Sequence, residues 1–144
     1  MSGVQLVIKS SQLLSMKVKT DTKEKFHAIS VETPHLSANM AAELNDQLSQ
    51  LLQSTNRNVV LKLKDVKSLD AIAAETLVKL QQKFYEQNAS FVICELDPEA
   101  ESFLDKTELL ELMNTTPTES EAWDIVQMEE IERELLDGSE SWND

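Results

Sequence analysis

Five short segments of the chain carry the patterns of β-strands. Residues 17–22 (KVKTDT) and 26–31 (FHAISV) lie on either side of a short KEK turn and predict a β-hairpin. In residues 58–66, Val59, Leu61 and Leu63 alternate with Val60, Lys62 and Lys64, which predicts a strand with one buried face and one mixed face. Residues 90–96 (SFVICEL) are almost continuously apolar, as in a strand covered on both faces. The stretch MNTTPT, residues 113–118, predicts a further short strand or a turn.

Between and after these segments, apolar residues recur every three or four positions, which is the spacing of amphipathic helices. The predicted helices are residues 37–54, 71–87, 99–112 and 119–136. Ser37 is the expected N-cap of the first helix, because a serine hydroxyl can accept a hydrogen bond from the N–H groups of the first turn. Asn88 follows the second helix and is expected to end it in the left-handed backbone conformation.

The predicted elements follow the order β-β-α-β-α-β-α-β-α, which is that of an α/β protein. We expect a single sheet of four to five mixed strands with four helices, in which right-handed crossovers make the central strands parallel. Residues 16–136 form this one domain. Residues 1–15 are expected to be a mobile extension or an extra edge strand, and residues 137–144 an acidic disordered tail.

The composition of the chain indicates its compartment. Its 144 residues include one cysteine, Cys94, which lies in the apolar segment 90–96. A single thiol excludes an internal disulfide and fits a reducing cytoplasm, and we expect it to be buried and unreactive. No apolar run approaches the roughly 18 residues that a membrane span needs, and the N-terminal region lacks the layout of a secretory signal. The sequence therefore predicts a cytoplasmic protein without membrane insertion.

The net charge of −13 is concentrated in the last third of the chain. Residues 89–144 contain seventeen Asp and Glu residues but only two Lys and Arg residues. Such a surface would repel the phosphates of a nucleic acid, so we expect no nucleic-acid partner. The acidic region is expected either to be a set of solvated helix faces or to bind a basic protein partner.

The residues that usually carry catalysis are sparse. The only glycines are Gly3 and Gly138, so a glycine-rich phosphate-binding loop cannot form within the domain. His27, His35 and Cys94 lack the spacing of metal ligands. The composition does not exclude a Ser–His–Asp triad, but no serine lies on a recognisable strand-to-helix elbow. We therefore expect no cofactor, no metal and no enzymatic activity, with a small enzyme whose site is unrecognised as a remote alternative.

The segment NVVLKLKDVKSLDAIAAETLVKLQQKF, residues 58–84, resembles the STAS domain of bacterial anti-sigma factor antagonists. Both have a strand of apolar residues, then Asp-Val, then a hydrophobic residue followed by an Asp at the start of a helix. The resemblance extends over residues 16–136, through a similar opening hairpin, first helix and closing helix. It implies the STAS-like (SpoIIaa-like) fold.

The chain departs from the family pattern at the start of the second helix. Asp70 matches the family's Asp, but Ala71, Ile72 and Ala73 stand where the family usually has Ser-Ser-Gly. In the family, a hydroxyl at this helix start is phosphorylated by the anti-sigma factor, a serine kinase. The resemblance therefore implies that this chain has no phosphorylation site at the family position. Ser68 and Thr76 are the nearby hydroxyls that leave a substitute site open.

The resemblance implies a non-catalytic regulatory protein that binds an anti-sigma factor or a similar kinase-like ATPase, and it leaves a weak homodimer open. The expected partner-binding residues are Thr33, His35, Ser37, Asn39, Ser68, Asp70, Ala71, Ile72, Ala73 and Thr76. We expect Asp70 to cap the second helix by accepting N–H bonds from its first turn. Two alternatives stay open: the alanines are only a tight helix start against the sheet, or the protein is a STAS accessory subunit of an ABC lipid transport system.

Overall fold

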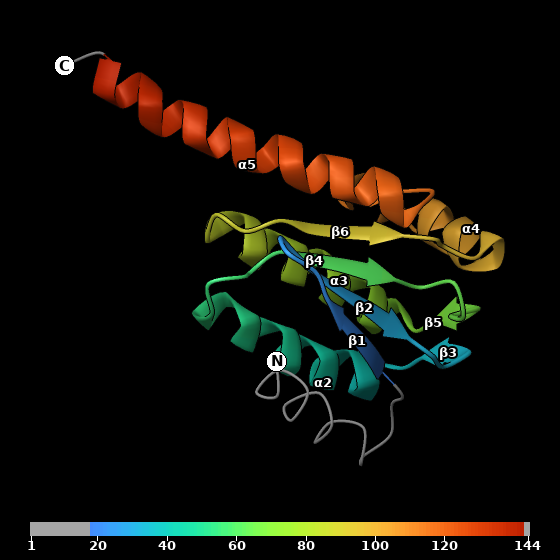
Figure 1. Cartoon of the computed structure of the whole chain (residues 1–144). Helices are drawn as coiled ribbons and strands as arrows, with labels where there is room; N and C mark the ends of the chain where they lie inside the picture. Colours follow the sequence, from blue (N-terminus) through green and yellow to red (C-terminus); the bar gives the residue numbers. More distant parts are fainter. Residues whose placement is uncertain (1–17, 143–144) are drawn as a thin grey trace.

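The computed structural model describes residues 18–142 (Figure 1). The main sheet consists of β1 (Val18–Thr22), β2 (His27–Val31), β4 (Val59–Lys62), β6 (Phe91–Cys94) and β7 (Thr115–Thr116). Two further short strands are β3 (His35–Leu36) and β5 (Ser68–Leu69). The helices are α2 (Ala38–Ser49), α3 (Ala71–Glu86), α4 (Pro98–Lys106) and α5 (Glu119–Trp142), with 3-10 turns η1 (Gln50–Gln53) and η2 (Leu110–Leu112).

The strands of the main sheet lie in the order β1-β2-β4-β6-β7. β1 pairs antiparallel with β2, with Val18 opposite Val31, and this is the predicted hairpin. β2, β4, β6 and β7 are parallel to one another. The α/β class, the element order and the mixed five-stranded sheet are therefore confirmed. β3 and β5, which form a separate parallel pair, were not predicted, because each has only two residues.

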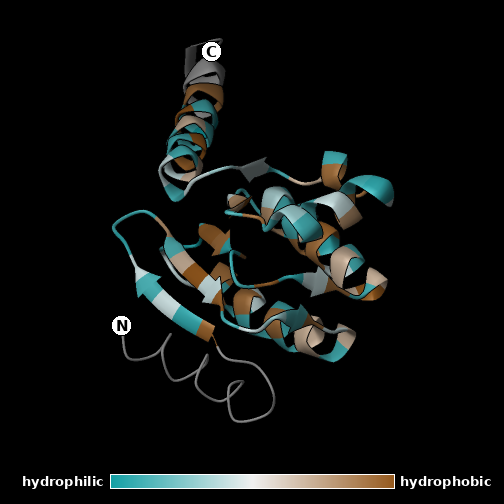
Figure 2. Cartoon of the chain, turned by 90° about the vertical axis from the view of Figure 1, so that its right-hand side faces the viewer, coloured by the Kyte–Doolittle hydropathy of each residue, from teal (hydrophilic) through white to brown (hydrophobic). Residues whose placement is uncertain are grey.

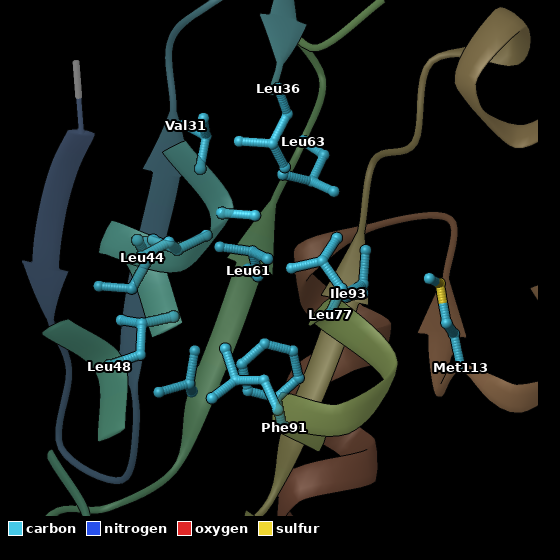
Figure 3. Packing of buried hydrophobic residues seen from close by; sticks show 14 of the residues in the cluster. Val31, Leu36, Leu44, Leu48, Leu61, Leu63, Leu77, Phe91, Ile93 and Met113 are labelled. Carbon is cyan, nitrogen blue, oxygen red and sulfur yellow. The ribbon is translucent and has the colours of Figure 1, made fainter. Parts of the chain in front are cut away.

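One face of the sheet carries most of the hydrophobic core. Val59, Leu61 and Leu63 pack in this core with side chains of α2, α3 and α4. Figure 3 shows Leu61 and Leu63 among the labelled core residues. Leu44 of α2 and Leu77 of α3 are fully buried there. The alternation predicted for residues 58–66 therefore has the expected outcome, although regular pairing ends at Lys62 and the next residues form a turn.

Among the described residues, α5 is the helix that packs on the other face of the sheet. Ala122 and Val126 of this helix are fully buried against a small cluster that includes Val60 and Cys94. The ring of Trp123 lies 5.3 Å, between centroids, from that of Phe26. The Cys94 thiol is buried as expected, and burial raises its pKa to about 12, which leaves it protonated and unreactive at neutral pH.

Two predicted helices are shorter in the structure. Residues 37–54 form α2 and then the tighter turn η1. Within 99–112, α4 ends at Lys106, where the N–H groups of Glu108 and Leu109 turn back to the carbonyls of Asp105 and Leu104. Glu108 then adopts a φ of 64°, which breaks the helix before η2. Asn88, with a φ of 63°, ends α3 as predicted.

The last helix is longer than predicted. α5 continues past residue 136 to Trp142, so residues 137–142, predicted as part of a disordered tail, are helical. Gly138 lies inside this helix without interrupting it, although glycine is a poor helix former. The extension predicted for residues 1–15 lies outside the described residues. Within the described part of the chain, no helix has the length and apolarity that crossing a bilayer requires.

Candidate functional site

The loops that lead into α2 and α3 start at the carboxyl ends of the parallel strands. In these loops β3 and β5 pair in parallel, with His35 opposite Ser68. The N–H of Asp70 adds a hydrogen bond of 3.0 Å to the last carbonyl of β3. This pairing holds the N-termini of α2 and α3 side by side. We call residues 33–39 and 68–76, which contain all the predicted partner-binding positions, the α2/α3 rim.

Asp70 links the two helices and does not cap α3 as predicted. Its Oδ2 accepts the N–H of Ala38, the first residue of α2, at 2.9 Å. Asp70 occupies the N-cap position of α3 by its backbone, but its side chain makes no cap hydrogen bond to that helix. The reason is the β3–β5 pairing, which brings the first N–H of α2 within reach of the carboxylate. A negative charge between two helix N-termini favours both helix dipoles.

The imidazole of His35 bridges Asp70 and Ser68. The Oδ1 atom of Asp70 lies 3.0 Å from Nε2, and the Ser68 Oγ lies 2.7 Å from Nδ1. A carboxylate can only accept, so Nε2 carries the proton, and the Ser68 hydroxyl donates to Nδ1 of the neutral ring. The Ala38 N–H first, and His35 second, lower the pKa of Asp70 below its ordinary value. The carboxylate is therefore ionised throughout the neutral range.

These three side chains have the composition of a Ser–His–Asp triad but not its geometry. In serine proteases the serine faces Nε2 and a buried aspartate faces Nδ1. Here the two nitrogens are exchanged, and the Asp70 side chain is 44% exposed. These three side chains therefore link the two loops that lead into α2 and α3.

The remaining polar positions of the α2/α3 rim have local roles. The Ser37 Oγ accepts the N–H of Met40 at 3.2 Å, which confirms it as the N-cap of α2. The Thr76 hydroxyl donates to the carbonyl of Ile72 one turn earlier, at 2.8 Å. The Thr33 hydroxyl lies 3.4 Å from the His35 carbonyl oxygen, and Asn39 is exposed. Of these residues, Asn39 is the most open to a partner.

The apolar positions at the start of α3 divide into outward and inward ones. Ala71 is exposed, and Ile72 is 62% exposed, which is unusual for a large aliphatic side chain. Ala73 is fully buried, so its side chain belongs to the core and cannot contact a partner as the sequence predicted. The periodicity of the helix explains the difference, because positions 73 and 74 face the sheet. The apolar contact surface of the rim is therefore Ala71 and Ile72.

A hollow lies away from the α2/α3 rim. It has a volume of about 650 Å³ and lies between the end of α3, β6 and α5, beside Tyr85, Asn114 and Glu129. Both carboxylate oxygens of Glu129 are already bonded, one to the Ser90 hydroxyl and one to the Asn114 amide. In residues 18–142 no group of His, Cys, Asp and Glu has the arrangement of a metal site.

The sequence identified the residues of the rim but not their relation. His35 and Asp70 are 35 positions apart, and the expectation treated the first as a loop residue and the second as a cap. The pairing of β3 with β5 brings them together, and strands of two residues leave no periodic pattern. The sequence offers one signal. Two similar segments each lie between a long strand and the helix that follows it: Pro34-His35-Leu36 and Lys67-Ser68-Leu69.

Comparisons with known proteins agree on one fold. Residues 17–122 match the family model of the STAS domain. An anti-sigma factor antagonist from Mycobacterium paratuberculosis is similar with a TM-score of 0.66 and 17% identity, over 78% of this chain and 95% of that chain. A STAS domain protein from Planctomyces limnophilus has a TM-score of 0.56 and 21% identity, over 76% of this chain and 97% of that chain.

Part of a larger protein is also similar. The murine anion transporter Slc26a9 matches 88% of this chain with a TM-score of 0.63 and 10% identity, but the match covers 24% of the transporter chain. At these identities the likeness to solved structures is a likeness of fold. A comparison with curated protein sequences finds no match.

Proposed function

Since the chain belongs to the STAS domain family, we propose that it is a cytoplasmic, non-catalytic regulatory protein that binds an anti-sigma factor of the serine kinase class. The binding surface is the α2/α3 rim. The fold that it shares with anti-sigma factor antagonists supports this proposal. The observation that carries it is Ile72, a large aliphatic side chain that is 62% exposed at the rim.

The surroundings of Ile72 favour docking of a protein. Binding is favoured when a partner covers an exposed aliphatic side chain, because removing apolar surface from water lowers the free energy. The Asp70 carboxylate and the His35 imidazole belong to the same rim and are half-exposed, so each can offer polar contacts to a partner. This is the arrangement of protein interfaces, which have an apolar core and a polar margin.

The proposed binding is independent of phosphorylation at the rim. Positions 71–73 carry no hydroxyl, so a kinase cannot add a phosphate there. The two hydroxyls within residues 68–76 form hydrogen bonds, Thr76 to the Ile72 carbonyl and Ser68 to the His35 ring. Binding is therefore expected to persist when the kinase partner has ATP.

A pair of matched substitutions on α3 tests the binding surface. Ile72→Glu places a charge at the rim, and Tyr85→Glu places the same charge on the same helix at the other end, where Tyr85 is 73% exposed. We expect Ile72→Glu to weaken binding to a purified anti-sigma kinase by about 30-fold or more, as for a central interface residue. Tyr85→Glu should bind like the wild type. Equal affinities of all three proteins in biolayer interferometry would reject the rim as the interface.

Restoring a hydroxyl tests the missing switch. Ala71 is exposed, so Ala71→Ser introduces a phosphorylatable group without disturbing the core. A phosphate there adds nearly two negative charges to the binding surface. With kinase and ATP, the Ala71→Ser protein should gain phosphate and dissociate, whereas the wild type should stay bound. ATP-dependent dissociation of the wild type would contradict the proposal.

The alternative function is an accessory subunit of an ABC lipid transport system. The similarity to part of an anion transporter is the observation that favours a role beside a transporter. Purification of the native protein at low salt separates the two functions, because it recovers either a kinase-like anti-sigma factor or an ABC ATPase.

A further inference from the structure

Helix α5 has two different apolar faces. The inner face, with Ala122 and Val126, is fully buried against the sheet. Two carboxylates then fasten the helix: Glu129 accepts the Ser90 hydroxyl at 2.5 Å, and Glu130 accepts the Asn58 amide at 2.7 Å. Beyond these contacts α5 leaves the body of the protein and projects past it (Figures 1 and 2).

The outer face carries a row of exposed apolar side chains. Met128, Ile131 and Leu135 are 59%, 54% and 64% exposed. Their spacing of three and then four residues places them in one line along the helix. Val126 and Met128 are about 200° apart around the helix axis, so this line faces away from the sheet. Leu136, 66% exposed, lies beside its end. We call Met128, Ile131, Leu135 and Leu136 the outer stripe.

Negative charge surrounds the outer stripe. Residues 119–136 contain seven Asp and Glu residues and one basic residue, Arg133. Around the helix axis, Glu132 lies on one side of the stripe and Glu134 on the other, and Asp124 lies on the line of the stripe one turn before Met128. Among the residues that the structure describes, none of these three makes a hydrogen bond or an ion pair to another side chain. Arg133 points back to the Ser90 hydroxyl at 3.4 Å, so it does not neutralise them.

This charge decides which molecule can cover the stripe. Two packed helices lie about 8–10 Å apart, which is close to the screening length of about 8 Å at physiological salt. A second copy of α5 would therefore meet strong repulsion, and so would an anionic membrane surface. A helix with an apolar row and flanking Lys or Arg residues would gain both burial of the stripe and attraction to the carboxylates.

We propose that the outer stripe of α5 is a second docking surface, which binds an amphipathic basic helix of a protein partner. The spacing of Met128, Ile131 and Leu135 is that of the seam between two paired helices. The stripe lies on the projecting helix, away from the α2/α3 rim, so one molecule can engage both partners. This surface does not depend on the function proposed for the rim.

Binding is tested with designed peptides of about three heptads that carry Leu at the seam. One has Lys at the flanking positions and the matched control has Glu there. We expect full-length protein to bind the Lys peptide in the micromolar range by fluorescence anisotropy, and the Glu peptide at least tenfold more weakly. The double variant Ile131→Gln with Leu135→Gln keeps every charge and should weaken the Lys peptide at least tenfold. Unchanged affinity of the double variant would mean non-specific charge attraction and would overturn the proposal.

Controls separate other ways of covering the stripe. Circular dichroism checks the helix, and Leu135→Gln alone gives the same comparison if the double variant loses helicity.

The only native cysteine, Cys94, is buried and has a pKa of about 12, so a thiol introduced by Ile131→Cys is the reactive one. The thiol at position 131 should react at once when the protein is dilute. If the thiol reacts slowly at every protein concentration, another segment of the same chain covers the stripe. If it reacts slowly only at high protein concentration, a second copy of the protein covers the stripe. Co-sedimentation with phosphatidylcholine vesicles would assign it to lipid. Each of these three results overturns the proposal.

Discussion

The two ends of the parallel strands both carry polar side chains, but they use them differently. At the amino ends the polar groups bond to one another. The Asn58 Oδ1 accepts the N–H of Ser90 at 2.8 Å, and its Nδ2 donates to the Lys25 carbonyl and to Glu130. Asn58 and Ser90 are buried. This network fastens α5 and the β-hairpin to the sheet, and its capacity for hydrogen bonds is used internally.

At the carboxyl ends, the corresponding groups face solvent. Asp70 and His35 bond to each other and remain half-exposed, and the exposed apolar Ile72 belongs to the same rim. Hydrogen bonding alone therefore does not mark a binding site. Polar groups that are buried and saturated hold the fold together, whereas polar groups that stay exposed beside an apolar side chain can bind another molecule.

The largest expected effect comes from breaking the network at the amino ends. Asn58→Ala leaves the buried N–H of Ser90 without its acceptor and frees Glu130 from its amide donor. We expect the free energy of unfolding to fall by about 3 kcal/mol, since each buried group left unpaired costs about 1–3 kcal/mol. Urea denaturation at neutral pH measures this loss.

Asn39→Ala is the matched control at the carboxyl ends, because Asn39 is exposed on α2. Its free energy of unfolding should stay within about 0.5 kcal/mol of the wild type. A similar loss in both variants would remove the distinction between the two ends.

A smaller effect is expected at the start of α2. Ser37→Ala removes the oxygen that accepts the N–H of Met40, so the free energy of unfolding should fall by about 1 kcal/mol. Ser102→Ala, at an exposed position inside α4, removes a hydroxyl without a capping role and should not destabilise the protein. Thermal unfolding of the two variants checks the difference, and equal melting temperatures would contradict the capping role.

The smallest effect depends on pH. His27 is buried at the amino ends, where its Nε2–H donates to the Asn56 carbonyl at 2.9 Å and its Nδ1 accepts the Thr22 hydroxyl at 3.1 Å. Burial lowers the pKa of His27 below its ordinary value of 6.5. The unfolded chain therefore takes up a proton before the folded protein does. Stability contributed by neutral His27 is complete above pH 6.5 and decreases as the pH falls from there toward the folded pKa.

The variant His27→Gln should lose this dependence. Denaturation by urea just above and about one unit below pH 6.5 should show a decrease in stability for the wild type and a smaller decrease for His27→Gln. An equal decrease in both proteins would show that other groups cause the pH dependence.

Much of the fold could be predicted because it leaves periodic patterns. The alternation of Val59, Leu61 and Leu63 predicted a strand with a buried face, and the structure agrees. The end of α3 at Asn88 followed from its tolerance of positive φ. The end of α4 was harder to predict: Glu108 takes a φ of 64° and breaks the helix in a segment whose apolar spacing predicts a longer one.

The rim shows a different limit. The sequence placed Asp70 at the start of α3 correctly, but it could not indicate that the carboxylate would turn to Ala38 and His35. The expected contact surface likewise included Ala73, which is buried, because the orientation of a helix around its axis is set by the sheet against which it packs.

By itself, the sequence determined the α/β order, the two-faced central strands, the lack of a hydroxyl at positions 71–73 and the acidity of the last helix. These properties depend on residue type and on spacing along the chain. Only the tertiary structure decided that Asp70 joins two helices, that Ile72 faces solvent while Ala73 does not, and that α5 has a second apolar face that is exposed among the described residues. The reason is physical: burial and hydrogen-bond partners depend on which distant segments meet, and short strands such as β3 and β5 bring segments together without leaving a pattern in the sequence.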